Sequence, residues 1–179
     1  MKHRPDEILN AAVDVFDAEG VSVSTAKLAS GIGISNGTLF NYFATKQDLI
    51  DALYLHLKRE LAHAIGAIDQ QAPLRDRARQ IWRRWAAWAT EHPASNRVMQ
   101  LLRSSRLVSA AAQGQADALL GDVGGVFAEG RASGDFADLP IAYLSASVQG
   151  QLELAVSLTM NQAELDAVFE SVWRGLTRA

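Results

Sequence analysis

Residues 24–46 read STAKLASGIGISNGTLFNYFATK, and this stretch decides how the N-terminal part of the chain folds. It predicts two short helices on either side of Gly33. Ser24 and Ser35 each stand where a hydroxyl can cap the start of a helix, and Gly33 supplies the turn between the two. Two capped helices joined by a glycine turn are typical of a helix-turn-helix.

The second of these helices has two chemically different faces. Its apolar side chains are expected to point to the core: Leu39, Phe40 and Phe43. Its polar side chains are expected to lie together on the opposite side: Thr38, Asn41 and Tyr42. Asn36 and Gly37 begin the helix, where free N–H groups and the positive end of the helix dipole favour a phosphate. Gly37 also allows close approach to DNA, because it has no side chain.

The remaining segments predict helices as well. No segment shows sustained apolar–polar alternation bounded by hairpin turns, so the chain is predicted to be all-α. The prolines stand where an apolar helical pattern starts or restarts, because proline is tolerated in the first turn of a helix and disfavoured in its interior. They are Pro5, Pro73, Pro93 and Pro140. About nine helices are expected, at residues 5–19, 25–31, 35–43, 45–70, 74–91, 94–108, 115–132, 140–160 and 162–177.

Composition narrows the class of protein. The chain has 179 residues, of which 49% are apolar and 21% charged, which is enough apolar material for a globular core. It has no cysteine, so disulfides and thiolate metal sites are excluded and a reducing compartment fits. The N-terminus lacks the apolar stretch of a secretory signal, and no apolar run approaches the roughly 20 residues that span a bilayer. A cytoplasmic location without membrane contact is expected.

The pattern around the helix-turn-helix resembles the tetracycline-repressor (TetR) family. The residues that carry the resemblance are Ile8, Leu9, Ala11, Ala12, Phe16, Gly20, Leu28, Ala29, Gly33, Ile34, Ser35, Gly37, Thr38, Leu39, Tyr42, Phe43, Lys46 and Leu49. The helices after them resemble that family only in number, length and order.

The resemblance carries implications for DNA binding and for the rest of the chain. It implies contacts to DNA phosphates by Thr25, Thr38, Tyr42 and Lys46. It implies that three residues lie near base edges: Asn36, Gly37 and Asn41. It also implies an effector pocket in the helical body and a homodimer through the last two helices. The predicted domains are a helix-turn-helix DNA-binding domain at 1–47 and an effector-binding and dimerisation domain at 48–179.

The charge of the predicted DNA-binding segment departs from that of many DNA-binding heads. Residues 1–47 carry four basic side chains against five acidic ones, and the whole chain has a net charge of −3. This counts against non-specific nucleic-acid binding as the main activity. Specific binding is therefore expected to use few charged contacts, with backbone amides and hydroxyls positioning the DNA.

Tryptophans and a few polar residues are candidates for effector binding. Trp82, Trp85 and Trp88 share one face of the helix at 74–91, where they either line an apolar pocket or pack in the core. The candidate lining comprises Trp85, Trp88, Gln100, Arg103 and Gln149. Such a lining suits an apolar or aromatic effector with one polar or anionic end.

The sequence gives little support for metal binding or catalysis. His56, Glu60 and His63 share a helix face and could bind a metal, but a solvated polar face is the favoured interpretation, and no metal or cofactor is expected. No phosphate-cradling glycine loop follows a strand, and no strand carries a nucleophile elbow. The chain is therefore predicted to have no catalytic residues and not to be an enzyme.

These observations predict a ligand-responsive DNA-binding transcription regulator. We expect a dimer on a near-palindromic operator, acting as a repressor that a small-molecule effector releases or re-orients. The predicted dimer helices are 140–160 and 162–177. The first has an apolar stripe that a monomer can bury only in part: Ile141, Leu144, Val148, Leu152 and Ala155. The alternative is a helical dimeric interaction protein without specific DNA binding.

Overall fold

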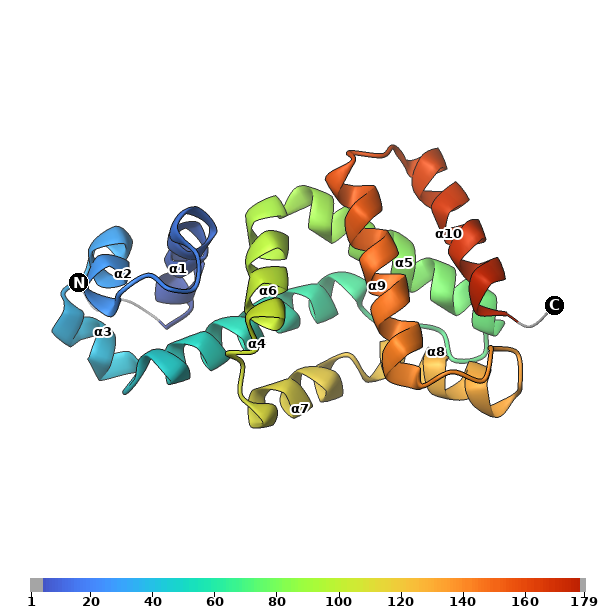
Figure 1. The fold of residues 1–179 in the computed structure, drawn as a ribbon, viewed down its shortest axis with the longest axis horizontal. Coiled ribbons are helices and arrows are strands. Elements are labelled where there is room, and N and C mark those ends of the chain that lie inside the picture. The colour runs from blue at the N-terminus through green and yellow to red at the C-terminus, as the bar shows by residue number, and fades with distance from the viewer. Residues whose placement is uncertain (1–4, 178–179) are drawn as a thin grey trace. The chain divides into compact units, whose positions relative to one another are not determined.

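The computed structural model describes residues 5–177, and within them the chain forms ten α-helices (Figure 1). They are α1 (Pro5–Glu19), α2 (Thr25–Ile32), α3 (Asn36–Tyr42), α4 (Lys46–Ile65), α5 (Leu74–Glu91), α6 (Pro93–Ser105), α7 (Ala110–Leu119), α8 (Gly121–Ala132), α9 (Ile141–Ser157) and α10 (Gln162–Leu176). The all-α prediction is confirmed. Two of the four basic residues in segment 1–47, Lys2 and Arg4, lie outside the described residues. None of the described helices is long and apolar enough to cross a membrane.

The described helices form two compact units. The first contains residues 5–60 and 92–119, and so holds α1, α2, α3, most of α4, α6 and α7. The second contains residues 61–91 and 120–177, with α5, α8, α9 and α10. Helix α4 thus contributes residues to both units. The functional boundary after residue 47 stays a prediction.

The first unit is built on an apolar core beneath the helix-turn-helix. Seven core side chains are at most 2% exposed: Ile8, Ala12, Phe16, Leu28, Leu39, Leu49 and Leu53. They come from α1, α2, α3 and α4, so burying them fixes the mutual placement of these four helices. Full burial of a leucine or phenylalanine side chain contributes roughly 1.5–3 kcal/mol. The predicted recognition helix is therefore held by packing and not by its own seven residues.

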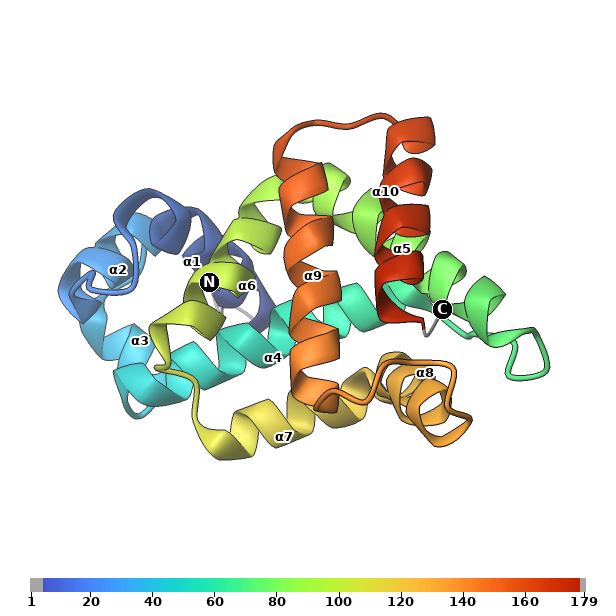
Figure 2. The same ribbon diagram turned by 45° about the vertical axis from the view of Figure 1, so that its right-hand side comes forward.

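The second unit packs α8, α9 and α10 against α5. Helices α9 and α10 run side by side, as Figures 1 and 2 both show. The Trp82 indole N–H donates to the Leu165 carbonyl at 3.0 Å, and the Trp82 ring lies 6.0 Å from that of Phe169. Trp82 is thus a core residue that joins α5 to α10.

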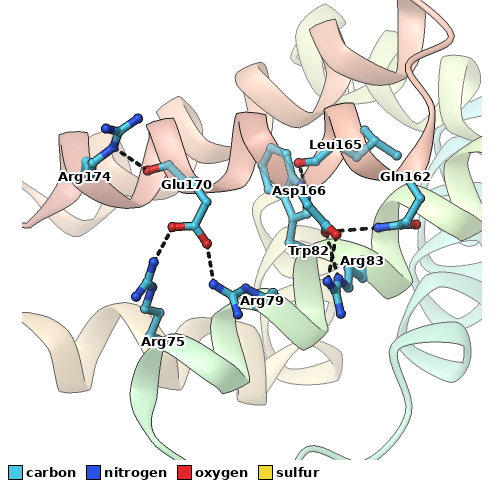
Figure 3. A network of polar contacts seen from close by, with 9 residues as sticks. All are labelled: Arg75, Arg79, Trp82, Arg83, Gln162, Leu165, Asp166, Glu170 and Arg174. Atoms are coloured by element: carbon cyan, nitrogen blue, oxygen red, sulfur yellow. Dashed lines mark hydrogen bonds and ion pairs between the residues drawn. The ribbon is translucent and has the colours of Figure 1, made fainter.

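Arginines on α5 also hold α10 through ion pairs (Figure 3). Arg83 donates to both carboxylate oxygens of Asp166, at 2.8 and 2.7 Å. Glu170, one turn further along α10, accepts from Arg75 and Arg79 together. The spacing of four residues on each helix places these groups on facing sides.

The predicted apolar stripe of α9 faces its own unit for most of its length. Leu144, Leu152 and Ala155 are at most 2% exposed, and Ala155 belongs to a cluster with Ala86 and Leu165. Ile141 is 39% exposed and Val148 is half-buried, so a single chain buries the stripe only in part, as predicted. Other apolar side chains of α9 lie at the surface instead.

Three predicted helices end several residues earlier in the structure, and the one predicted at 140–160 ends at Ser157. The helix predicted at 45–70 ends at Ile65, because Gly66 takes a left-handed conformation with φ of 59°. The helix predicted at 94–108 ends at Ser105, since Arg106 is left-handed at φ of 58°. Nothing in the sequence indicates that an arginine will take the left-handed conformation, so the end of this helix was predicted too late.

The segment predicted as one helix at 115–132 is two helices, α7 and α8. Leu120 interrupts them with φ of −106° and ψ of 33°, outside the α-helical range. Helix α7 starts earlier than predicted, because the Ser109 hydroxyl accepts a hydrogen bond from the Ala112 N–H at 3.2 Å. Ser109 is thus a capping serine that the sequence analysis missed.

Candidate DNA-binding surface

Both predicted serine caps of the helix-turn-helix are confirmed. The Ser24 hydroxyl accepts from the Lys27 N–H at 3.2 Å, and the Ser35 hydroxyl accepts from the Thr38 N–H at 3.0 Å. Gly33 ends α2 in the left-handed conformation, with φ of 84°. A side chain there would meet no atom within 4 Å, so Gly33 is required by backbone conformation and not by space.

The outward face of α3 differs in part from the predicted one. Its exposed residues are Asn36, Gly37, Phe40 and Asn41. Thr38 is half-buried, with its hydroxyl 2.8 Å from that of Ser35, and Tyr42 is half-buried with its ring centroid 6.5 Å from that of Phe43. The predicted base-edge residues are therefore all exposed, whereas the two hydroxyl-bearing residues lie at the margin of the surface.

Phe40 was expected in the core, and this is wrong: its side chain is 38% exposed. Leu39 and Phe43 lie four residues apart and occupy the inward face of a helix only two turns long. Phe40 follows Leu39 by about 100° around the helix axis and so points outward with Asn36 and Asn41. The outward face of α3 consequently carries an exposed aromatic ring among polar groups.

Gly37 lies on this face with open space above it. A Cβ atom built on it would find Ser35 Oγ at 3.9 Å, an ordinary contact, and no closer atom. Neither packing nor backbone conformation within the chain therefore demands glycine here. The absence of a side chain leaves room for an external group to reach the first turn of α3.

Lys46 contacts the segment that precedes Thr25. The Lys46 ammonium donates to the carbonyls of Val21 and Val23, each at 2.7 Å. Thr25 is half-buried at the first position of α2. Lys46, predicted to contact a DNA phosphate, thus binds the segment that precedes Thr25, and its charge is directed at backbone oxygens.

Two acidic side chains of the N-terminal segment are held in ion pairs. Lys27 lies 2.6 Å from a carboxylate oxygen of Glu19. Asp17 is paired with Arg97 of α6, and the hydrogen bond from Arg97 lowers the pKa of the Asp17 carboxyl, while its burial works in the opposite direction. Two of the five acidic side chains in 1–47 are therefore neutralised locally, one by a residue outside that segment.

The predicted effector residues are distributed over both compact units. Gln100 and Arg103 lie on α6 in the first unit, whereas Trp85 and Trp88 of α5 and Gln149 of α9 belong to the second. Trp85 and Trp88 are buried, at 8% and 3% exposed. The Gln100 side-chain nitrogen is buried and has no hydrogen-bond acceptor among the described residues. The joint role of these five residues stays a prediction.

His56, one of the two histidines of α4, takes part in polar contacts. His56 is buried, and its Nε2 lies 2.7 Å from Asn10 Oδ1 and 3.3 Å from a Glu60 oxygen. His63 is exposed. Within residues 5–177, no group of three or more His, Cys, Asp or Glu residues could hold a metal ion. His56 therefore joins α1 to α4.

Comparisons with known proteins agree with the helix-turn-helix. The model of the family "Bacterial regulatory proteins, tetR family" matches residues 8–53. Nucleoid occlusion factor SlmA of Vibrio vulnificus (strain YJ016) is 31% identical over 100 residues, which are 54% of this chain and 51% of that protein. The HTH-type transcriptional regulator BetI of Ectopseudomonas mendocina (strain ymp) is 32% identical over 75 residues, 39% of this chain and 38% of that protein. The chain spans about half the length of the curated relatives it matches.

The likeness to solved structures extends over nearly the whole chain. A crystal structure from Shewanella sp. PV-4, of a protein assigned to the tetR family of transcription regulators, superposes with a TM-score of 0.84. It is 29% identical, and the alignment covers 97% of this chain and 98% of that one.

The chain belongs to the tetR family of bacterial regulatory proteins, a class of DNA-binding transcription regulators with this helical fold. Because this family comprises regulators and not enzymes, the prediction that the chain is not an enzyme is confirmed.

Proposed function

We propose that the protein is an effector-responsive transcription regulator, a repressor that binds a near-palindromic operator as a homodimer in the cytoplasm. The observation that carries the DNA-binding part is the outward face of α3. It combines two exposed amides, Asn36 and Asn41, with a glycine that no internal contact requires, Gly37. Amide side chains can read base edges in the major groove, most often adenine.

In this proposal α3 enters the major groove and the surrounding groups position the DNA backbone. The proposed base-edge residues are Asn36, Gly37 and Asn41. Three proposed phosphate contacts carry hydroxyls: Thr25, Thr38 and Tyr42. The DNA-binding head, formed by α1, α2, α3 and the start of α4, has no positive net charge. Hydroxyls and backbone N–H groups suit such a head, because they donate to phosphate without adding charge.

The proposed dimer uses the exposed faces of α9 and α10. Tyr143, Leu154 and Leu158 are 60%, 54% and 58% exposed, and Glu153 is the one charged residue of α9. On α10 the exposed residues at every fourth position are small: Ala163, Ala167, Ser171 and Gly175. An apolar face beside a row of small residues allows two copies to pack closely about a twofold axis.

The proposed effector is an apolar or aromatic molecule with one polar or anionic end. Buried tryptophans, Trp85 and Trp88, supply apolar surface. The polar end of such a molecule needs a hydrogen-bonding partner, because a buried polar group without one is costly. An effector acts as a switch if it binds one state of the dimer more tightly than the other.

The test is selection of duplexes from a random library by the purified full-length chain, followed by titration of the selected sequence. We expect a near-palindromic site, and Asn41→Ala should lose at least about tenfold of its preference for that site over a scrambled duplex. The matched control is Ala44→Ser, at an exposed position just after α3. Failure of the wild-type chain to enrich any sequence would overturn the proposal in favour of an interaction protein.

A second candidate function is nucleoid occlusion. The match to SlmA covers 100 residues, whereas the helix-turn-helix model matches 46, so this similarity continues past the DNA-binding head. Deleting the gene in its host separates the two functions. Altered transcription next to a selected binding site supports the regulator, whereas division septa formed across the nucleoid with unchanged transcription support nucleoid occlusion.

A further inference from the structure

The turn between α1 and α2 is held by a side chain from far along the sequence. Lys46 begins α4, yet its ammonium donates to the carbonyls of Val21 and Val23 at 2.7 Å each. The side chain is partly buried in reaching them. Hydrogen bonds from a charged donor are about twice as strong as those between neutral groups.

Hydrogen bonding within the turn itself is weak. Gly20 starts it in the left-handed conformation with φ of 76°. The hydrogen bond from the Val23 N–H to the Gly20 carbonyl is long, at 3.4 Å, and is correspondingly weak. The two bonds from Lys46 are much shorter, so they contribute more to the conformation of residues 20–24 than the internal bond does.

We infer that Lys46 is a positioning residue whose ammonium fixes the α1–α2 turn and thereby the start of α2. Ser24 and Thr25 follow directly after the two carbonyls that Lys46 engages, so the α2 N-terminus is placed by this contact. The effect on DNA binding rests on the proposed function. Because two of the three ammonium N–H groups are used inside the head, Lys46 acts on DNA through Thr25 and α2 and not as a phosphate ion pair.

Lys27 offers a matched control. It lies on the neighbouring helix with its side chain 61% exposed, paired with Glu19. Lys27→Met and Lys46→Met remove the same charge from the same head. The first breaks an exposed ion pair, which contributes little to stability, whereas the second removes both hydrogen bonds to the turn carbonyls. Lys46→Arg is the conservative variant, since its guanidinium can still donate to both carbonyls.

The first measurement is amide hydrogen exchange in the free protein. The reporters are the amides of Val23 and Leu28, which are bonded to the Gly20 and Ser24 carbonyls. Lys46→Met should accelerate their exchange about tenfold, Lys46→Arg should largely restore it, and Lys27→Met should leave it unchanged. Unchanged amides in the middle of α4 establish that the Lys46→Met head is folded. Unaltered exchange at Val23 and Leu28 in folded Lys46→Met overturns the inference.

The second measurement is the salt dependence of affinity for a selected duplex. Lys46→Met should weaken binding while keeping the wild-type slope of log affinity against log salt. A phosphate ion pair would instead lower that slope by about one unit. A slope lowered by that amount overturns the inference whatever the exchange result. If the wild-type chain selects no duplex, the proposed function fails, while the exchange experiment still decides the role of Lys46.

Discussion

Asp17 on α1 and Arg97 on α6 form a two-pronged ion pair, with Nε 2.8 Å from Oδ1 and Nη2 2.6 Å from Oδ2. The two residues are 80 positions apart in sequence. Helix α6 therefore supplies a charge to the DNA-binding head, and this ion pair joins it to α1.

This pair predicts an acid-sensitive contribution to stability. The hydrogen bond from Arg97 lowers the pKa of Asp17, so the stabilisation is present above the unfolded-state pKa of about 3.9 and is lost as pH falls through the lower folded-state value. Arg97→Ala should reduce the free energy of unfolding at pH 7 by at most about 1 kcal/mol, because the arginine is exposed. Urea unfolding at pH 7 and pH 3 measures this. A difference from wild type that persists unchanged at pH 3 would contradict the assignment.

Acid should also loosen α10. Burial tends to raise the pKa of Glu170, yet the hydrogen bonds from Arg79 and Arg75 bring it below its ordinary value, and Arg83 lowers the pKa of Asp166. Protonation as pH falls through these lowered pKa values removes both carboxylate charges. Amide exchange in the middle of α10 should then accelerate, and Glu170→Gln should show part of this acceleration already at pH 7. Exchange in Glu170→Gln identical to wild type at pH 7 would count against a role for the network.

Phe40 should recognise a thymine methyl group. An exposed aromatic ring on the α3 face suits apolar contact with the C5-methyl, which the major groove presents only at thymine. Replacing the contacted thymine by uracil removes one methyl group and should weaken wild-type binding about fourfold. Phe40→Ala should be indifferent to that replacement while keeping the wild-type melting temperature. Equal loss in both proteins at every thymine would rule out this contact.

Leu154 should be part of the dimer contact. Its side chain is 54% exposed on α9, so Leu154→Lys should leave a single subunit folded while placing a charge in an apolar interface. Light scattering at micromolar concentration should show the mass of a dimer for wild type and of a monomer for the variant. Arg59→Ala, a change at an exposed position of α4, serves as control. A wild-type monomer would contradict the proposal.

Trp82 and Trp85 should respond differently to truncation. Trp82 is 2% exposed and bonded to Leu165, so Trp82→Ala should cost about 3–5 kcal/mol of unfolding free energy. If Trp85 lines an effector cavity, Trp85→Ala costs less and mainly alters the effector response. Chemical denaturation of both variants makes the comparison. Equal costs would show that Trp85 also packs in a solid core.

Local features of the fold could be predicted from sequence, because a few adjacent residues determine them. The caps at Ser24 and Ser35 and the left-handed Gly33 are of this kind. The break at Leu120 was missed, since no residue there forbids a helix.

The candidate site shows the same division between local and long-range features. Helical spacing predicted Asn41 on the face away from the core, and Asn41 is exposed there. Phe40 was predicted on the wrong face. Whether an apolar side chain is buried depends on which other side chains already occupy the inward face of its helix, and here these are Leu39 and Phe43. The contacts of Lys46 and Arg97 join distant segments, and spacing along the chain carries no information about such pairs.

The position of α3 does not depend on Gly37 and its exposed neighbours. The serine caps, the glycine turn and the buried Leu39 hold α3 in place whatever occupies the outward positions. Substitutions at these positions should therefore alter which sequences are recognised with little cost in folding. A protein built in this way can acquire a new target by a few single changes, each passing through a fully folded intermediate.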